Sequence, residues 1–330
     1  MRVAVTGGTG YIGGHTVRAL LTAGHEVELL VSPKPHSAEL MEKLSELGDI
    51  KALPGDVRDP DTIANLLAGK DAVVHAAGVV GTDDSQEKLM WEINAHAAET
   101  VLVQAANRGL DPIVSVSSYA ALFPPPGPVI GPDTPPAAGK TAYARTKAYA
   151  DRVARRLQDD GAPVVVTYPS SVVGPAFATH AGVTEQGWVS ITKSRMAPRL
   201  RGAGMMMIDV RDVADVHVAL MRPGRGPKRY VCGGTMLSFD EMISALESGT
   251  GQHVRRIPMS PGVFRGLGRL SDAVNRVLPI GGAFSYEAAQ LITAAIPTDD
   301  SLTLSELGLQ WRSPIDAIIA TFRDASANQV

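Results

Sequence analysis

The chain has 330 residues, of which 45% are hydrophobic and 20% charged, and its formal net charge is −3. These values are typical of a soluble globular protein with one large domain, or with one large and one small domain. A slightly acidic chain without a dense run of Lys and Arg has no polyanion-binding surface, so nucleic acid is not an expected partner. The single cysteine, Cys232, excludes an intramolecular disulfide and a cysteine-rich metal site.

The first half of the chain alternates short apolar segments with longer amphipathic ones. The apolar segments predict strands at 3–6, 26–31, 50–56, 72–78, 112–118 and 164–171. The amphipathic segments predict helices at 11–23, 37–47, 60–68, 86–108 and 141–160. Strands that alternate with helices form right-handed crossovers and a parallel sheet covered on both faces. The sequence therefore predicts an α/β protein with a doubly wound parallel sheet, the Rossmann fold.

The second half of the chain is less regular. Residues 123–140 are rich in Pro and Gly and predict a long loop, which inside a compact domain is usually functional. Residues 207–221 predict a strand and a helix that return to the main sheet. The chain is expected to divide into a large Rossmann domain made of 1–174, 207–231 and part of 291–330, and a smaller C-terminal substrate lobe made of 175–206 and 232–290.

Targeting, membrane and metal signals are absent from the sequence. Residues 1–6, MRVAVT, predict a strand rather than a signal peptide, and no window has about 18 uninterrupted apolar residues. The eight histidines show no H-x-x-x-H spacing. We therefore expect a cytoplasmic protein with no membrane partner and no metal.

The turn after the first strand is rich in glycine. Gly7, Gly10 and Gly13 form G-x-x-G-x-x-G between that strand and the first helix. In this context the first glycine permits a tight turn, the second lets the backbone approach a pyrophosphate, and the third lets the helix pack close to the strand. The N–H groups and the dipole at the helix start favour phosphate. We expect a bound dinucleotide here, with Tyr11 and Ile12 of the same turn beside it.

Two further strand ends fit an adenine nucleotide. Asp56 and Val57 follow the third strand, where a carboxylate accepts a hydrogen bond from the adenine amino group and Val covers the ring. The alternative for Asp56 is a solvated turn. Ala76, Ala77 and Gly78 end the fourth strand, and their small side chains either leave room for the cofactor ribose or reflect close packing.

The end of the second strand bears on the choice between NADP and NAD. An NAD enzyme usually has an Asp or Glu there, which accepts from the ribose 2′-hydroxyl and repels a 2′-phosphate. The sequence instead has Val31-Ser32-Pro33-Lys34, with a hydroxyl and an ammonium that suit a phosphate. We therefore expect NADP rather than NAD. A Lys34 that points into solvent is the alternative.

The segment TAYARTKAYA, residues 141–150, contains a candidate catalytic pair. Tyr143 and Lys147 are four residues apart, so they lie on the same face of a helix. A free tyrosine titrates near ~10, and a lysine ammonium with an oxidised nicotinamide nearby lowers that pKa. Tyr143 then acts as a general acid or base toward a carbonyl or an alcohol. Taken alone the pair is a weak signal, because Tyr and Lys meet at this spacing by chance as well.

Several motifs together carry a resemblance to a known family. In chain order these are TGGTGYIG, GDVRD, HAAG, SVSSYA, YARTK, YPSSVVGP, RDVADVHVAL and ELGLQWRSP. The set resembles the extended short-chain dehydrogenase/reductase superfamily over nearly the whole chain. VVGP after the sixth strand is most similar to the dihydroflavonol reductase and 3β-hydroxysteroid dehydrogenase branches. The motifs together identify the superfamily, but they do not identify which of its reactions the protein catalyses.

The resemblance implies roles for individual residues. Ser118 would hydrogen-bond the reacting oxygen, with Ser117 as the alternative, and Lys147 would also hold the nicotinamide ribose beside Tyr143. Asn94 would have a structural or water-holding role, or lie on a helix surface. Pro169, Ser171 and Val172 of YPSSVVGP would contact the cofactor. His75, which ends an apolar strand, is interpreted as a core histidine.

The resemblance also bears on the reaction. Dehydratases of the superfamily place an Asp-Glu pair where this chain has Tyr119 and Ala120, so a dehydratase is disfavoured. A nucleotide-sugar epimerase with bound NAD stays open, because arginines for its pyrophosphate are available at Arg195, Arg199 and Arg201. A non-catalytic NADP-binding redox sensor is the second alternative, although such proteins usually lose the Tyr or the Lys.

The residues of the substrate lobe favour an apolar substrate. Candidate pocket residues are Val172, Val173, Phe177, Trp188, Met196 and Met205–Met207. We expect an NADP-dependent oxidoreductase that reduces a hydrophobic ketone or aldehyde, or oxidises the corresponding secondary alcohol, through Ser118, Tyr143 and Lys147. The resemblance makes a homodimer compatible with the sequence.

Overall fold

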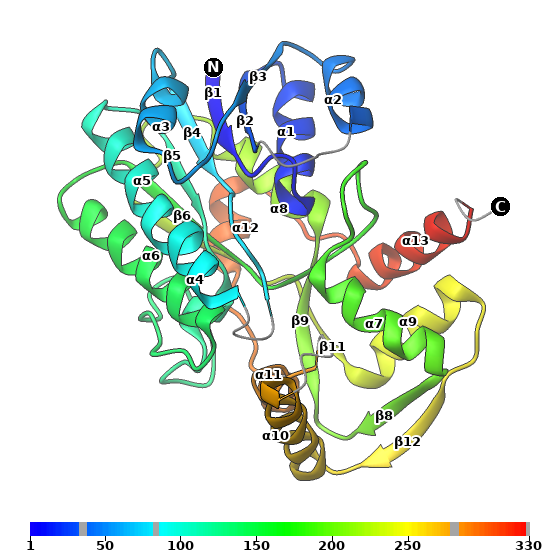
Figure 1. Cartoon of the computed structure of the whole chain (residues 1–330). Coiled ribbons are helices and arrows are strands. Elements are labelled where there is room, and N and C mark those ends of the chain that lie inside the picture. Colours follow the sequence, from blue (N-terminus) through cyan, green and yellow to red (C-terminus); the bar gives the residue numbers. More distant parts are fainter. Residues whose placement is uncertain (33–37, 82–85, 278–283, 328–330) are drawn as a thin grey trace.

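The computed structural model describes residues 1–32, 38–81, 86–277 and 284–327 (Figure 1). Lys34, which we predicted to bind the cofactor phosphate, lies outside these residues. Among the described residues, no helix is long and apolar enough to cross a membrane. No group of three or more His, Cys, Asp or Glu side chains within the described ranges is arranged to hold a metal ion.

A seven-stranded sheet forms the centre of the molecule. Its strands are β1 (Arg2–Thr6), β2 (Glu26–Val31), β3 (Ile50–Pro54), β4 (Ala72–His75), β5 (Ile113–Val116), β6 (Val164–Pro169) and β10 (Lys228–Cys232). All six neighbouring pairs are parallel, in the order β10-β6-β5-β4-β1-β2-β3. The predicted doubly wound α/β fold is confirmed.

Helices cover both faces of this sheet, which explains why its central strands are mainly apolar. On one face, α1 (Tyr11–Thr22), α2 (Ala38–Ser45) and α8 (Val210–Ala219) pack on a core that includes Val3 and Val5. On the other face, α3 (Pro60–Leu67), α5 (Ala98–Asn107) and α6 (Ala142–Asp159) pack on a core that includes Ala4. Successive residues of a strand point to opposite faces, so both faces need apolar side chains.

The helix predicted at 86–108 is interrupted. It consists of α4 (Glu87–Met90), a π-helical segment η2 (Trp91–Ala97) and α5. A π-helical turn accommodates an extra residue and is often found at functional sites. Here the π-helical segment carries Asn94, whose side chain is buried.

Two smaller sheets lie beyond the main one. β9 (Gly204–Asp209) pairs with β7 (Ser171–Val173) and β11 (Thr235–Ser238), and β8 (Met196–Leu200) pairs with β12 (Arg255–Met259). The expectation that the strand near residue 207 returns to the main sheet is therefore wrong. It is β10 that joins the main sheet beside β6, while α8 packs against α1. An apolar run does not specify which strand it pairs with.

The remaining helices accompany the small sheets. They are α7 (Val183–Ser194), α9 (Phe239–Thr250), α10 (Pro261–Val277), α11 (Tyr286–Ala294), α12 (Ser301–Leu307) and α13 (Pro314–Ala327). Most of them share a third hydrophobic core with β8, β9 and β11, whereas α12 contacts β10. In Figure 1 the elements β8, β12, α7, α9, α10 and α11 gather at the lower side of the molecule, away from β1 to β3. The exact boundaries of the two expected domains stay a prediction.

Candidate active site

Two glycines of the turn after β1, Gly7 and Gly13, have no room for a larger residue. Gly7 has φ +75°, and a Cβ there would lie 2.4 Å from the Ala77 nitrogen. A Cβ on Gly13 would lie 2.1 Å from the Gly7 oxygen, because α1 packs directly against the turn. The Gly10 N–H donates to the Gly7 oxygen at 3.0 Å, and α1 begins at the next residue. This tight turn at a helix start fits the pyrophosphate of a dinucleotide.

A cavity of about 1080 Å³ opens at this turn. It lies at the carboxyl ends of β1 and β4, where the strand order reverses and where open α/β sheets bind ligands. From there it extends past Tyr143 to α7, β8, β12, α10 and α11. One continuous cavity therefore joins the glycine turn to the second, smaller part of the molecule.

Most of the residues that we predicted to bind the cofactor line this cavity. They are Gly7, Gly10, Tyr11, Ile12, Gly13, Ser32, Asp56, Val57, Ala76, Ala77, Gly78, Tyr143, Ser171 and Val172. Among the described residues, Pro169 and Lys147 do not contribute to its wall. Pro169 is the last residue of β6, and Lys147 lies behind Gly78, where a Cβ would be 3.5 Å from the Lys147 Nζ. The residues present fit an NAD(P) cofactor.

The end of the cavity near β3 holds a charged group. Asp56 accepts a hydrogen bond from the Arg58 N–H at 2.9 Å, and its carboxylate pairs with the Arg58 guanidinium at 2.6 Å. Arg58 also pairs with Glu92 at 2.7 Å. Asp56 is thus held in place by its neighbour in the turn, and both residues line the cavity together with Ser32.

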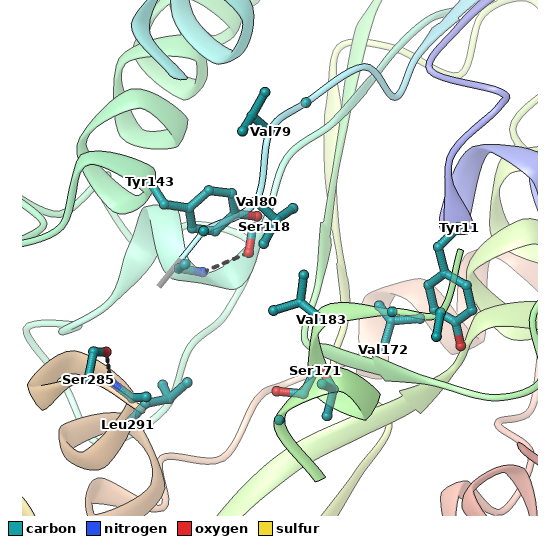
Figure 2. A pocket seen from close by; sticks show the side chains of 18 of the residues that line it. Tyr11, Val79, Val80, Ser118, Tyr143, Ser171, Val172, Val183, Ser285 and Leu291 are labelled. Atoms are coloured by element: carbon teal, nitrogen blue, oxygen red, sulfur yellow. Dashed lines mark hydrogen bonds between the residues drawn. The ribbon is translucent and has the colours of Figure 1, made fainter. Parts of the chain in front are cut away.

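Ser118 and Tyr143 meet at the middle of the cavity (Figure 2). Ser118 lies after β5 and caps the start of the short helix η3 (Tyr119–Leu122). Its Oγ accepts a hydrogen bond from the Ala120 N–H at 3.2 Å. Burial raises the pKa of Tyr143, and a hydrogen bond between its side chain and that of Ser118 lowers this pKa in part. Without a bound cofactor Tyr143 is therefore neutral at pH 7 and carries a proton that it can donate.

Lys147 lies one helical turn after Tyr143 and is buried. Its Nζ donates to the Val116 carbonyl oxygen at 3.1 Å, which fixes the ammonium at the end of β5. Burial lowers the pKa of Lys147 from 10.5 to about 8. A charge held at low dielectric acts strongly on a neighbouring phenolate. The nearby His75 is kept neutral, since burial and the Lys147 charge lower its pKa to about 3.

The two candidate serines differ in their surroundings. Ser118 lines the cavity and contacts Tyr143, whereas the Ser117 hydroxyl is buried and has no hydrogen-bond partner among the described residues. The structure thus places Ser118, and not Ser117, in the cavity beside Tyr143.

Two polar side chains outside the predicted catalytic set hold the walls of the site. Asn94 accepts from the Val79 N–H at 2.7 Å and donates to the Val79 oxygen at 2.8 Å. Glu287 of α11 accepts from the N–H and the hydroxyl of Thr141, at 2.8 and 3.0 Å. Thr141 caps the start of α6, so Glu287 reaches the helix that carries Tyr143 from the other part of the molecule. Glu287 acts on backbone far away in sequence, for which the sequence has no local signal, whereas the contact of Asn94 agrees with the structural role that the resemblance implied.

Tyr11 anchors the loop after β7. Its hydroxyl donates to the Gly174 oxygen at 2.6 Å and lies 3.2 Å from the Glu185 carboxylate. Glu185 is buried, and desolvation raises its pKa, while it also accepts from the backbone N–H of Gly174 and Gly182. The ring of Tyr11 lines the cavity, whereas its hydroxyl is used to join α1 to α7.

The far end of the cavity is apolar. Of the pocket residues that we predicted, Val172, Trp188, Met196 and Met205 line it. Val173, Phe177, Met206 and Met207 are not part of its wall; Phe177, for example, packs beside His15 with the Arg18 guanidinium 4.9 Å from its ring centre. Further apolar side chains come from Ile191, Phe239, Met242, Ile257, Met259, Phe264, Leu267, Phe284, Leu291 and Ile292.

Charged residues are few along the whole cavity. Among the described residues, those in its wall are Asp56 and Arg58 near β3 and Glu287 near Tyr143. Arg195, Arg199 and Arg201, the candidate ligands for a nucleotide-sugar pyrophosphate, do not line it. Arg199 instead pairs with Asp240 at 3.2 Å.

Comparison with known proteins agrees with this architecture. The sequence profile described as the NAD dependent epimerase/dehydratase family matches residues 3–233. The chain belongs to this family. The family is part of the extended short-chain dehydrogenases/reductases, which confirms the resemblance seen in the sequence, and an NAD(P) cofactor is typical of it.

Members of the family with several different functions are similar to the chain. It is 26% identical to sterol demethylase protein B of Methylococcus capsulatus, over 98% of this chain and 99% of that protein. It is 26% identical to a putative dihydroflavonol 4-reductase of Synechocystis, over 75% of this chain and 72% of that protein. It is 27% identical to UDP-glucose 4-epimerase of Neisseria meningitidis, over 76% of this chain and 83% of that protein.

Solved structures of the family share the fold. UDP-glucose 4-epimerase from Bifidobacterium longum, in complex with NAD+ and UDP, superposes with a TM-score of 0.76 at 20% identity, over 99% of this chain and 98% of that chain. DesIV, a dTDP-glucose 4,6-dehydratase from Streptomyces venezuelae with NAD bound, superposes with a TM-score of 0.77 at 23% identity, over 100% and 98%. The likeness concerns the fold and does not select a substrate.

Proposed function

We propose that the chain is an NADP-dependent oxidoreductase that reduces a hydrophobic ketone or aldehyde, or oxidises the corresponding secondary alcohol. The observation that carries this proposal is the apolar wall of the cavity beyond Ser118 and Tyr143. Binding pockets of this composition bury apolar molecules and orient them with a few polar groups. Here the hydroxyls of Ser118 and Tyr143 are such groups.

The geometry supports a division of roles among the three residues. The nicotinamide, when bound, supplies or accepts the hydride. Ser118 and Tyr143 face the cavity from β5 and α6, so both hydroxyls can hydrogen-bond one substrate oxygen. Tyr143 donates its proton to that oxygen in reduction and removes it in oxidation. Lys147, held by the Val116 carbonyl, stabilises the phenolate that Tyr143 forms.

The names of the relatives are consistent with an apolar substrate. Sterol demethylase protein B matches over nearly the full length of both chains, and its name refers to a sterol. Dihydroflavonol 4-reductase and 2-alkyl-3-oxoalkanoate reductase are named for reductions of an aromatic ring compound and an alkyl compound.

A nucleotide-sugar epimerase with bound NAD is the second candidate, since several relatives have that name. The pyrophosphate of a nucleotide sugar needs cations, and in the described part of the chain the one cation in the cavity wall is Arg58, near β3 and paired with Asp56 and Glu92. Dehydration is disfavoured as well, because Tyr119 and Ala120 replace the acid pair, and the Tyr119 hydroxyl is 3.1 Å from Ser171 Oγ.

The preference for NADP rests on the end of β2. Val31 ends that strand, and Ser32, which follows it, lines the cavity. A hydroxyl there can donate to a 2′-phosphate, whereas an NAD enzyme usually has a carboxylate. A partly exposed phosphate contact of this kind contributes roughly 1–3 kcal/mol. We expect NADPH to bind about 5- to 150-fold more tightly than NADH, and Ser32→Asp to reverse the order.

The test is a screen of the purified protein with NADPH and NADH against aryl and alicyclic ketones, with UDP-glucose in parallel. Oxidation of NADPH that depends on a ketone, and its loss in Tyr143→Phe, would support the proposal. Epimerisation of UDP-glucose without ketone reduction would favour the second candidate. NADPH binding without turnover of any carbonyl would favour a redox sensor.

A further inference from the structure

Exposed apolar side chains are concentrated in one region of the molecule. The described part of the chain has ten large apolar side chains that are exposed, and seven of them lie on α7, β8, β12 and α10. We call these seven the apolar rim: Val189, Met196, Ile257, Val263, Leu267, Leu270 and Val274. Single exposed apolar residues are normal, but a cluster of this kind marks a surface that contacts something other than water.

The helix α10 contributes four of the seven. These four side chains recur at spacings of four, three and four residues, so they form one stripe along the helix: Val263, Leu267, Leu270 and Val274. Their exposed fractions are 55%, 42%, 60% and 38%. A different side of the helix packs inward, because Phe264 is 7% exposed and a Cβ on Gly268 would lie 2.8 Å from Tyr286 Cα. The stripe is thus not needed for the internal packing of α10.

The apolar rim continues into the cavity of the candidate active site. Met196, Ile257 and Leu267 belong to both, since each is exposed and also lines the cavity. Phe264 and Met259 line the cavity between them. An apolar molecule can therefore pass from the rim into the cavity without leaving an apolar surface.

The same segments are basic, although the whole chain is not. Residues 186–208 and 251–271 contain eight Lys and Arg and no Asp or Glu, whereas the formal net charge of the chain is −3. Arg199 and Arg256 pair with Asp240 and Glu247 of α9. No ion pair with a carboxylate occurs within the described ranges for the other six, which are Lys193, Arg195, Arg201, Arg255, Arg265 and Arg269.

We propose that the apolar rim binds the surface of an anionic lipid bilayer, with the stripe of α10 in the boundary between head groups and acyl chains. An amphipathic helix with Arg beside an apolar stripe lies in this boundary, and the attraction to anionic lipid adds to the burial of the stripe. Long cationic side chains reach the head groups while their stems stay on apolar surface. Such a contact needs no membrane-spanning helix, so it is compatible with the lack of one among the described helices. It departs from the expectation of no membrane partner, which was based on spanning segments alone.

Charge favours a bilayer over a second copy of the chain as the partner. A symmetric dimer through the apolar rim would bring two sets of unpaired Lys and Arg together, and like charges across an interface are unfavourable. An anionic lipid surface neutralises them instead. The cavity then opens toward the membrane, where an apolar substrate of the proposed function would be dissolved.

The contact with lipid can be measured without turnover, so its failure is distinguishable from failure of the proposed function. The full-length chain is sedimented with vesicles of phosphatidylcholine alone and of phosphatidylcholine with an equal amount of phosphatidylglycerol. We expect binding to the anionic vesicles, and binding to decrease as NaCl is raised, because salt screens the attraction.

Matched variants test which surface is responsible. Val263→Ser with Leu270→Ser removes two side chains of the stripe that do not line the cavity. Leu47→Ser with Val129→Ser removes two exposed apolar side chains outside the apolar rim, whose exposed fractions are 39% and 41%. We expect the first pair to weaken binding to anionic vesicles about tenfold or more, the size expected for the apolar area removed, and the second pair to leave binding within about twofold of wild type.

Three results would overturn the proposal. The wild-type chain would stay in the supernatant with anionic vesicles at low salt, or it would bind both vesicle types equally and independently of salt. Alternatively, light scattering would show a wild-type dimer that Val263→Ser with Leu270→Ser converts to a monomer, which would assign the apolar rim to self-association. Unchanged NADPH binding by both variant pairs serves as the check that they are folded.

Discussion

Asn94 holds the backbone of Val79 by two hydrogen bonds. The Val79 N–H donates to Asn94 Oδ1 at 2.7 Å, and Asn94 Nδ2 donates to the Val79 oxygen at 2.8 Å. Asn94 Nδ2 also lies 3.3 Å from Thr146 Oγ1 of α6, the residue before Lys147. One buried amide thus connects the segment after β4, which lines the cavity, with the helix that carries Tyr143 and Lys147.

We predict that Asn94→Ala destabilises the protein and weakens cofactor binding. The substitution leaves the N–H and the carbonyl of Val79 without partners, which costs roughly 1–3 kcal/mol. Urea unfolding and NADPH titration measure the two effects. Asn107→Ala, at an exposed position at the end of α5, is the control and should change the free energy of unfolding by no more than ~0.5 kcal/mol. Wild-type stability in Asn94→Ala would contradict this role.

A second prediction separates the two neighbouring serines. Ser118→Ala removes the hydroxyl that contacts Tyr143 in the cavity, so turnover should fall by about 10- to 1000-fold, while the lost cap of η3 costs about 0.5–2 kcal/mol of stability. Ser117→Ala removes a buried hydroxyl that has no partner among the described residues, so it should leave turnover unchanged and stability equal or slightly higher. Steady-state kinetics and thermal unfolding of both variants check this, and a reversed pattern of turnover would assign the role to Ser117.

Tyr143→Phe should lower turnover by on the order of 10²-fold or more, since it removes the general acid. The ring is retained, so NADPH affinity should stay close to that of wild type. Single-turnover kinetics at saturating NADPH, together with a cofactor titration, separate the two effects. Near-full turnover in this variant would exclude proton transfer by Tyr143.

Lys147→Met should stabilise the protein without cofactor at pH 7 while it abolishes turnover. Burial lowers the folded-state pKa of Lys147 to about 8, below its ordinary value of 10.5. The buried charge therefore lowers the free energy of unfolding at pH values below about 8. This cost disappears as the pH rises from about 8 to 10.5, because over that range the unfolded state binds more protons.

We therefore expect a gain of roughly 1–3 kcal/mol in Lys147→Met at pH 7, which shrinks between pH 8 and 10.5. The lost hydrogen bond to the Val116 carbonyl offsets part of it. Urea unfolding across this pH range measures the gain. Lys88→Met, whose lysine side chain is 92% exposed, is the control and should change stability by no more than ~0.5 kcal/mol. A Lys147→Met variant that is less stable than wild type at pH 7 would refute this account.

The main sheet could be predicted from the sequence because its signals are local. Each parallel strand is a short apolar run bounded by turn residues, and the glycine turn at 7–13 is defined by backbone space within a few residues. The same holds for Tyr143 and Lys147, which share one face of α6. These features depend on neighbours in the sequence and were therefore visible in it.

The errors concern partners that are distant in sequence. The segment 204–209 has a strand-like apolar run, but nothing in the run states whether it joins β6 or pairs with β7 and β11. The contact of buried Asn94 with Val79 is the structural role that the resemblance implied, but the sequence did not separate it from a position on a helix surface, because the partner lies 15 positions away. Phe177 looked like a pocket residue by its chemistry, yet it packs beside His15 instead.

The contact between Glu287 and Thr141 has a consequence for motion. Glu287 belongs to α11, and its carboxylate accepts two hydrogen bonds from the residue that caps α6. A swing of α11 away from the main sheet would break both bonds, whereas the hydrogen bond from the Ala144 N–H to Thr141 Oγ1 lies within α6 and would remain. Ligand entry by such a swing would therefore remove the support that α11 gives to the start of the helix that carries Tyr143, and the return of α11 would restore that support.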